Sequence, residues 1–391
     1  MKSFVVLFTL PLAALAAPIL EARAGASVIP GQFIVVLKSD STQGQMESNL
    51  DSASTILGGC KPKSSYYFGS FKGYHVSASE DLIRSIAALD EVTLVDYVEP
   101  DITVSTNALV TQTNAPWGLA RISSRRRGTT SYTYDNSAGA GTYAYIIDTG
   151  IYLQHPDFEG RASFGATFVS GDSSQTDGNG HGTHVAGTTG SRTYGIAKRT
   201  NLIAVKVLDS SGSGTLSQVI SGIQWAVNDM QNKQRTGRAV ANLSLGGGMS
   251  QSLNAAAAAA VRAGLFMSVA AGNENADAST SSPASEPSVC TVAATDSSDR
   301  RGSFSNYGSL VDVFAPGVSI VSTWNDGTTR VLSGTSMATP HVTGLGAYLL
   351  TLEGARTPSA LCSRIQSLAT VGVVQNAMSS NNRLAFNGAT R

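Results

Sequence analysis

The segment Tyr145-Ile146-Ile147-Asp148-Thr149-Gly150 carries the clearest information about the fold. It is a short apolar run that ends in a carboxylate and a glycine, which is typical of a buried strand followed by a tight turn. Similar apolar runs lie at residues 143–147, 202–207, 239–244 and 265–270, and stretches with helical spacing lie at 181–188, 216–232 and 252–263. This alternation predicts an α/β fold, with a parallel sheet covered by helices on both faces and functional groups at strand ends and helix starts.

Asp148 closes the first of these strands. An unpaired buried carboxylate is costly, so the Asp148 side chain needs a partner inside the protein. Taken alone, a helix cap or a loop anchor is the simpler explanation of this residue.

The segment 177–187, DGNGHGTHVAG, is less ordinary. Glycines on both sides of His181 permit close approach of the backbone, and the small apolar residues that follow suit a buried helix. His181 and His184 lie three residues apart, which also suggests a metal site, but no glutamate accompanies them as in the metalloprotease helix motif. We therefore favour a catalytic histidine over a zinc ligand.

A third segment, GTSMATPHV at 334–342, reads as a glycine turn into an apolar helix that runs through Leu349. Ser336 then lies at the helix start, where free amides favour developing negative charge. Pro340 is expected within the first turn, where few amide donors are lost. The alternative is that Ser336 is an ordinary helix cap, and the segment lacks the Gly-x-Ser-x-Gly elbow of many lipases and esterases.

Together the three segments give the chain order Asp148, His181, Ser336, which is the order found in subtilisin. In such a triad His181 takes the proton of Ser336 and Asp148 orients and stabilises the imidazolium. A fourth segment, SVAAGN at 268–273, ends in Asn273, whose side-chain amide can donate to an oxyanion together with the backbone amide of Ser336. The four residues form a hypothesis for a serine hydrolase.

On these motifs the chain resembles the subtilases of the proteinase K subfamily, which include secreted fungal and cuticle-degrading proteases. The resemblance runs from QTNAPWGL at 112–119 nearly to the end of the chain, and PGQFIV at 30–35 with YVEP at 97–100 resembles the subtilase inhibitor prodomain. It implies a subtilisin-like parallel sheet flanked by helices, preceded by a small α+β ferredoxin-like prodomain. It also implies a serine endopeptidase of broad specificity that acts through an acyl-enzyme.

The resemblance also implies where a peptide binds, as an added strand between two enzyme segments. These segments and the pocket for the residue before the cut correspond to Gly212, Ser213, Gly214, Leu216, Ser244, Leu245, Gly246, Ala270, Ala271 and Gly272. None of these residues is acidic, so we expect cleavage after apolar or aromatic residues rather than basic ones. Leu216 replaces a tyrosine of proteinase K, which is expected to alter preference at the next pocket.

Calcium and a disulfide are further implications of the resemblance. Pro287, Val289 and Asp312 match the tight calcium site of the family, with two carbonyls and one carboxylate as hard oxygen ligands, so one structural Ca²⁺ is expected. Cys290 and Cys362 match one family bridge. The cysteine content alone permits this pair in an oxidising compartment but does not prove it.

The amino terminus predicts secretion, because residues 1–17 have the charge, apolar run and small residues of a signal peptide. We expect a prodomain at 18–107, containing Cys60, and a peptidase domain at 108–391, released by self-cleavage between Asn107 and Ala108. Between positions 18 and 107 there are 11 acidic and 6 basic residues, whereas the rest of the chain has a basic excess, so the two parts should attract each other.

The expected partners are therefore protein and peptide substrates and the chain's own prodomain, acting on an extracellular monomer. Nucleic acid is not expected, because the one basic cluster, at 125–127, is more simply a solvated loop. No membrane span is expected after the signal peptide, because no later apolar run approaches 20 residues. An inactive protease-like binding protein is the competing hypothesis, and intact Asp148, His181, Asn273 and Ser336 argue against it.

Overall fold

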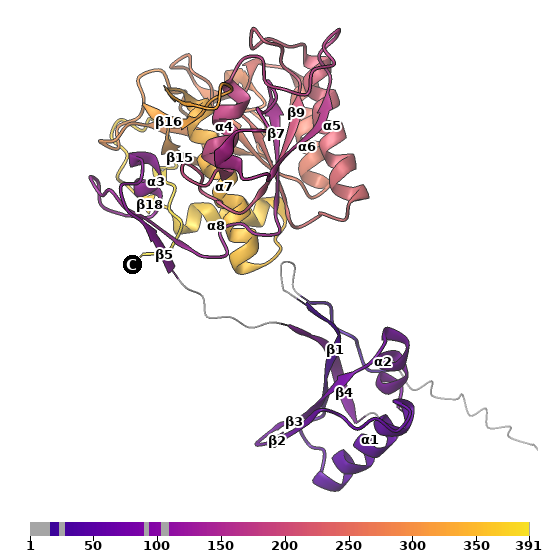
Figure 1. Cartoon of the computed structure of the whole chain (residues 1–391). Helices are drawn as coiled ribbons and strands as arrows, with labels where there is room; N and C mark the ends of the chain where they lie inside the picture. The colour runs from indigo at the N-terminus through magenta and orange to yellow at the C-terminus, as the bar shows by residue number, and fades with distance from the viewer. Residues whose placement is uncertain (1–15, 23–27, 90–93, 103–108, 391) are drawn as a thin grey trace, which may run out of the picture. The chain divides into compact units, whose positions relative to one another are not determined.

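The computed structural model describes residues 16–22, 28–89, 94–102 and 109–390. The chain divides into two compact units, Met1–Ser105 and Thr106–Arg391 (Figure 1). Most of the expected signal peptide, and both Asn107 and Ala108, lie outside the described residues. No helix in the described ranges is long and apolar enough to cross a membrane.

The first unit is a four-stranded antiparallel sheet with two helices, in the chain order β-α-β-β-α-β and the sheet order β2-β3-β1-β4. This is the ferredoxin-like topology that we expected. Its elements are β1 (Val28–Leu37), α1 (Gln43–Ile56), β2 (Ser64–Phe68), β3 (Phe71–Ser77), α2 (Glu80–Ala87) and β4 (Val95–Ile102). Residues 17–20 continue the unit, since Leu20 N donates to Val98 O and Val98 N donates to Pro18 O.

The second unit is built on a nine-stranded sheet in the order β18-β19-β15-β14-β12-β10-β7-β9-β8. Its strands pair in parallel except β18 with β19. The strands are β7 (Tyr143–Asp148), β8 (Ala162–Thr167), β9 (Asn201–Lys206), β10 (Ala239–Leu243), β12 (Phe266–Ala270), β14 (Cys290–Thr295), β15 (Val313–Pro316), β18 (Thr370–Val371) and β19 (Arg383–Leu384). This is the α/β architecture with a parallel sheet that the alternation predicted.

Helices cover both faces of this sheet. Successive residues of each strand point to opposite faces, so each strand contributes to both cores. Ala144 and Ile146 of β7 pack in the core cluster that holds α4 and α7, whereas Tyr145 and Ile147 pack in the cluster that holds α5 and α6. The helices of the unit are α3 (Trp117–Ile122), α4 (His181–Gly190), α5 (Leu216–Asn232), α6 (Gln251–Arg262), α7 (Thr335–Glu353) and α8 (Pro358–Leu368), with short 3₁₀ helices at Pro156–Phe158 and Ala278–Thr280.

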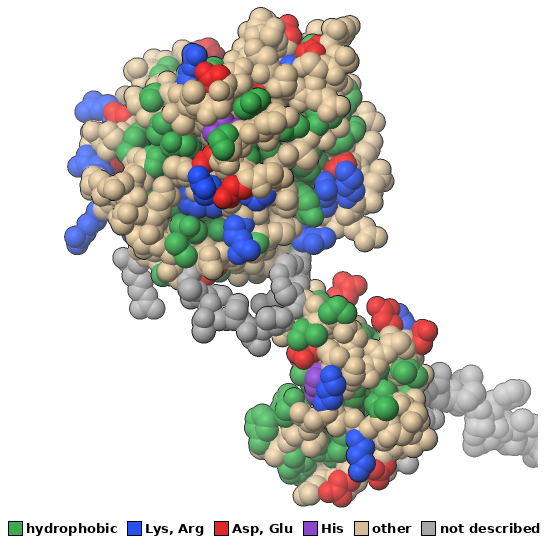
Figure 2. Space-filling model, viewed as in Figure 1, with side chains coloured by type: hydrophobic (Ala, Val, Ile, Leu, Met, Phe, Trp, Pro, Cys, Tyr) green, Lys and Arg blue, Asp and Glu red, His purple; other side chains and the backbone are tan. Residues whose placement is uncertain are grey.

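Three two-stranded antiparallel pairs complete the unit. They are β5 (Leu109–Gln112) with β6 (Tyr132–Asp135), β11 (Gly247–Gly248) with β13 (Ser281–Ser282), and β16 (Ile320–Thr323) with β17 (Thr329–Leu332). On the face of this unit that Figure 2 shows, basic and acidic side chains lie in small separate groups that include both signs. The charge on this face is therefore dispersed.

One expectation about α7 is wrong. Pro340 is not in the first turn, because the helix begins at Thr335 and Pro340 is its sixth residue. A proline inside a helix leaves the carbonyl four residues earlier without its usual donor. That carbonyl belongs to Ser336, and it accepts a hydrogen bond from Ser244 Oγ at 2.7 Å instead. The proline thereby makes the backbone of Ser336 available to the neighbouring segment.

Candidate active site

Asp148 and His181 are in contact. Asp148 is the last residue of β7 and is 0% exposed, and His181 is the first residue of α4. The distance from His181 Nδ1 to Asp148 Oδ1 is 2.7 Å, and the same oxygen accepts a hydrogen bond from Thr149 N at 2.8 Å. The carboxylate therefore has the partner that its burial requires, and it fixes the orientation of the imidazole.

The glycines around His181 are required by close packing. Gly180 has a φ of 107°, and a Cβ placed there would lie 2.3 Å from the Trp324 ring. A Cβ at Gly182 would lie 2.1 Å from the carbonyl oxygen of Gly150, in the turn that follows β7. Both glycines are needed to bring the start of α4 against the end of β7.

Ser336 lies in the first turn of α7, beside the strand-end segment that contains Ser244. Its hydroxyl donates to Ser244 O at 3.0 Å, and no hydrogen bond joins Ser336 Oγ to His181 within the described ranges. Catalytic hydrogen bonds are often long in unliganded enzymes and tighten only with substrate. Ser336 and His181 nevertheless line one groove of about 620 Å³.

Asn273 lines the same groove and is held by the residue before Ser336. Its Oδ1 accepts from Thr335 N at 2.8 Å and from Thr335 Oγ1 at 3.0 Å. The side-chain amide is thereby oriented with its nitrogen free, and neither Asn273 Nδ2 nor Ser336 N donates to an acceptor in the described part of the chain. Two hydrogen-bond donors are thus available beside the Ser336 hydroxyl.

The pKa of His181 is raised above the ordinary histidine value. Burial alone would lower the pKa, but the charge of Asp148, the hydrogen bond to it and the charge of Asp177 together outweigh burial. In contrast, burial lowers the pKa of His184 to about 4, and its Nε2 lies 3.1 Å from the carbonyl oxygens of Ile320 and Arg330. His184 is therefore a neutral packing residue and shares no metal site with His181.

Most residues expected to bind substrate surround two neighbouring hollows. The groove of about 620 Å³ is lined by Gly212, Ser213, Gly214, Leu216, Ser244, Leu245 and Gly246. A second pocket of about 260 Å³ shares Leu245, Gly246, Asn273 and Ser336 with it and adds Ala270 and Gly272. Ala271 is fully buried and lines neither hollow.

Glu274 was missed by the sequence reasoning. It lines the second pocket, and a Cβ placed on Gly272 would lie 2.6 Å from its Oε2. Asn306 Nδ2 donates to the same oxygen at 2.8 Å. The sequence signal was present, since Glu274 directly follows Asn273, but the expected pocket segment ended at Gly272.

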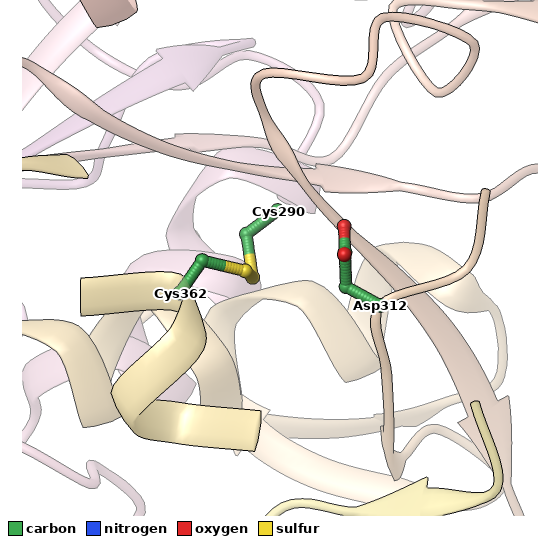
Figure 3. Close-up of side chains that lie close together, drawn as sticks. All are labelled: Cys290, Asp312 and Cys362. Carbon is green, nitrogen blue, oxygen red and sulfur yellow. A yellow bond between two sulfur atoms is a disulfide. The ribbon is translucent and has the colours of Figure 1, made fainter. Parts of the chain in front are cut away.

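Cys290 and Cys362 form a disulfide, as expected, and Asp312 lies beside it (Figure 3). Ligand atoms of these three residues lie within 4.8 Å of one another. Sulfurs joined in a disulfide offer no thiolate, so this group is not a cysteine metal site. Asp312 Oδ2 accepts from Thr291 N and Oδ1 accepts from Gln366 Nε2, each at 2.8 Å.

The geometry is typical of a class, the serine hydrolases: at the strand ends of a parallel α/β sheet, a histidine–carboxylate pair lies in one groove with a serine at a helix start and two free hydrogen-bond donors. Comparison with protein families matches residues 139–384 to the subtilase family. The chain belongs to this family and is a subtilisin-like serine endopeptidase that acts on protein and peptide substrates.

The chain is similar along nearly its whole length to fungal proteases. It is 52% identical over 373 residues to the subtilisin-like serine protease AsES of Sarocladium strictum, covering 95% of this chain and 93% of that one. It is 50% identical over 372 residues to Proteinase R of Parengyodontium album (95% and 92%), and 48% identical over 365 residues to the cuticle-degrading protease of Metarhizium anisopliae (93% and 91%). Its structure resembles that of a cold-adapted subtilisin-like serine proteinase, with a TM-score of 0.67, 47% identity and coverage of 70% of this chain and 99% of that one.

Proposed function

We propose that the chain is a secreted, broad-specificity endopeptidase made as a zymogen, in which Ser336 is the nucleophile, His181 the general base and acid, Asp148 its orienting carboxylate and Asn273 an oxyanion donor. The observation that carries this proposal is the 2.7 Å contact of His181 with Asp148 in a groove that Ser336 and Asn273 also line. Intact residues at all four positions argue against an inactive binding protein.

The proposed reaction begins when His181 Nε2 takes the proton of Ser336 as its oxygen attacks the peptide carbonyl. The resulting oxyanion accepts hydrogen bonds from Asn273 Nδ2 and Ser336 N. His181 then gives the proton to the leaving amine, and water hydrolyses the acyl-enzyme by the same steps. His181 must start neutral, so its raised pKa places the acid limb of the activity profile above the ordinary histidine value of about 6.5.

The substrate is proposed to bind as an extended strand between residues 212–214 and 244–246, which line the larger groove. The residue before the cut occupies the second pocket, whose walls include glycines and Ala270 and suit apolar or aromatic side chains. Glu274 adds one carboxylate to this pocket, so basic residues are accepted as secondary substrates.

One structural calcium ion is proposed near Asp312. Asp312 directly precedes β15 and Val289 directly precedes β14, and the two strands are parallel neighbours. Burial raises the pKa of Asp312 to about 6, and no ion pair to a Lys or Arg satisfies it within the described ranges. A cation would stabilise this carboxylate, and the carbonyls of Pro287 and Val289 would complete a hard oxygen set.

Residues 1–17 are proposed to direct secretion. Residues 18–107 are proposed to assist the folding of the peptidase domain and to inhibit its activity until cleavage between Asn107 and Ala108. The compact ferredoxin-like unit and its acidic excess support this division. Profiling a peptide library with the purified mature enzyme tests the activity and specificity together. Cleavage mainly after apolar and aromatic residues is expected, and cleavage mainly after acidic residues would contradict the proposed pocket.

A further inference from the structure

A second carboxylate, Asp177, is buried close to His181 and has no role in the reaction described above. Its residue is 3% exposed, and it accepts five hydrogen bonds. Oδ1 accepts from Thr149 Oγ1 at 2.8 Å, Asn179 N at 3.0 Å and Gly180 N at 2.8 Å. Oδ2 accepts from Thr183 N at 2.9 Å and Thr183 Oγ1 at 2.6 Å.

These bonds replace an ordinary helix cap. The residue before α4 is Gly180, which has no side chain to cap the helix. Free amides of a first helical turn need acceptors from elsewhere. Thr183 N bonds to the carboxylate directly, and Gly182 N donates at 2.8 Å to Thr149 Oγ1, the hydroxyl that itself donates to Asp177.

The same bonds connect the two elements that carry the Asp148–His181 contact. Thr149 directly follows Asp148 at the end of β7, and Gly182 directly follows His181 in α4. Asp177 therefore joins the neighbour of one catalytic residue to the first turn that carries the other. This hydrogen-bonded connection leaves little freedom for the 2.7 Å distance between His181 Nδ1 and Asp148 Oδ1 to change.

We infer that Asp177 is a positioning residue of the protease, which fixes the distance and orientation between His181 and Asp148 by capping α4 and tying it to Thr149. The inference rests on the proposed role of His181. Displacement of reacting groups by about 1 Å can cost about 100-fold in rate, so the loss of this link should appear in turnover.

The charge of Asp177 gives the inference a second, independent readout. The charged groups that shift the pKa of His181 are Asp148 at the end of β7 and Asp177 in the preceding loop, and the nearby titratable group is His184 in α4, whose own pKa is lowered. Both carboxylates raise the pKa of His181, and Asp177 does so without touching the ring. Removing its charge should therefore move the acid limb of kcat/KM to lower pH.

The test compares four variants of the full chain after maturation. Asp177→Asn removes the charge and replaces one acceptor oxygen by an NH2 group, with little change in shape. Thr149→Val removes the connecting hydroxyl but keeps the carboxylate, and Thr149→Ser restores the hydroxyl. Asp157→Asn is the matched control, because Asp157 is 6% exposed and similarly accepts from Thr193 N at 2.9 Å and Thr193 Oγ1 at 2.6 Å.

Asp177→Asn is expected to lower kcat about 10- to 100-fold with little change in KM, and to shift the acid limb to lower pH. Thr149→Val should lower kcat and leave the acid limb where it is in the wild type. Thr149→Ser should have a kcat close to the wild-type value. Asp157→Asn should lower the melting temperature and leave kcat unchanged. If Asp177→Asn does not fold, the two Thr149 variants decide. The inference is overturned if kcat survives in Asp177→Asn or in Thr149→Val, or if Asp157→Asn loses as much. Unchanged hydrolysis by Ser336→Ala would instead refute the proposed function itself.

Discussion

Replacing Asn273 isolates one of the two proposed oxyanion donors. Ser336 N remains in place in such a variant, so only the contribution of Asn273 Nδ2 is lost. Removing one donor of this kind from a subtilisin costs about 2.7 to 4 kcal/mol. We therefore expect Asn273→Ala to lower kcat about 100- to 1000-fold while KM stays close to the wild-type value, because the oxyanion exists only in the transition state.

The structure separates this catalytic loss from a loss of stability. Asn273 Oδ1 holds two donors of Thr335, so Asn273→Ala also leaves these without an acceptor and lowers the free energy of unfolding by about 1 kcal/mol for each. Asn273→Asp keeps an acceptor for Thr335 but puts a negative oxygen where the amide nitrogen was. The kcat of Asn273→Asp should fall at least as far as that of Asn273→Ala, whereas its melting temperature should stay at the wild-type value.

The assay is steady-state hydrolysis of a chromogenic peptide anilide with phenylalanine before the cut, with melting measured by calorimetry. If Asn273→Ala keeps kcat within tenfold of wild type, or raises KM alone, Asn273 is not an oxyanion donor. An aspartate variant more active than the alanine variant would refute the assigned orientation of the amide.

Three other predictions address the disulfide, calcium and the specificity pocket. Replacing Cys290 and Cys362, which are 72 residues apart, by alanine should cost about 4.4 kcal/mol from loop entropy and lower the melting temperature by roughly 5–10 °C; an unchanged calorimetric transition would show that the bridge adds no stability. Chelation of calcium should lower the melting temperature of the mature enzyme, because it removes about 2.7 kcal/mol of stability if free calcium is at 100 times its Kd. Asp312→Asn should abolish this response to chelation. Equal sensitivity of the wild type and the variant would place the ion elsewhere. Glu274→Gln should reduce kcat/KM for a lysine anilide and leave the phenylalanine anilide nearly unaffected, whereas equal effects on both would remove Glu274 from the pocket.

The central strands and helices could be predicted from the sequence because burial on both faces of a parallel sheet gives apolar runs. The range expected for the helix at 216–232 is the observed α5, and β7, β9, β10 and β12 lie within one or two residues of their expected ranges. In contrast, β2 is mostly exposed although three of its five residues are aromatic, and it was not among the predicted strands. It pairs with β3 as a hairpin through Gly69 and Ser70, and a one-sided exposed hairpin strand has no buried face to mark it in the sequence.

The candidate site was predicted to a similar extent. Asp148, His181, Asn273 and Ser336 were found because each lies in a distinctive glycine-rich segment. Glu274 and Asp177 lie in or beside the same segments, but their roles depend on which side chains the fold brings to them. The position of Pro340 beyond the first turn of α7 was missed for a related reason. The donor that replaces the lost helix bond to Ser336 O comes from Ser244, which is 92 residues from Ser336 in the sequence.

Ser336 is the proposed nucleophile, and the proposed reaction begins from its hydroxyl. The decisive measurement is labelling of the mature enzyme with a fluorophosphonate, followed by mass spectrometry of the labelled peptide. We predict one label per molecule, on Ser336, with labelling and peptide hydrolysis both lost in Ser336→Ala. A label on another residue, or hydrolysis that persists in Ser336→Ala, would contradict the account.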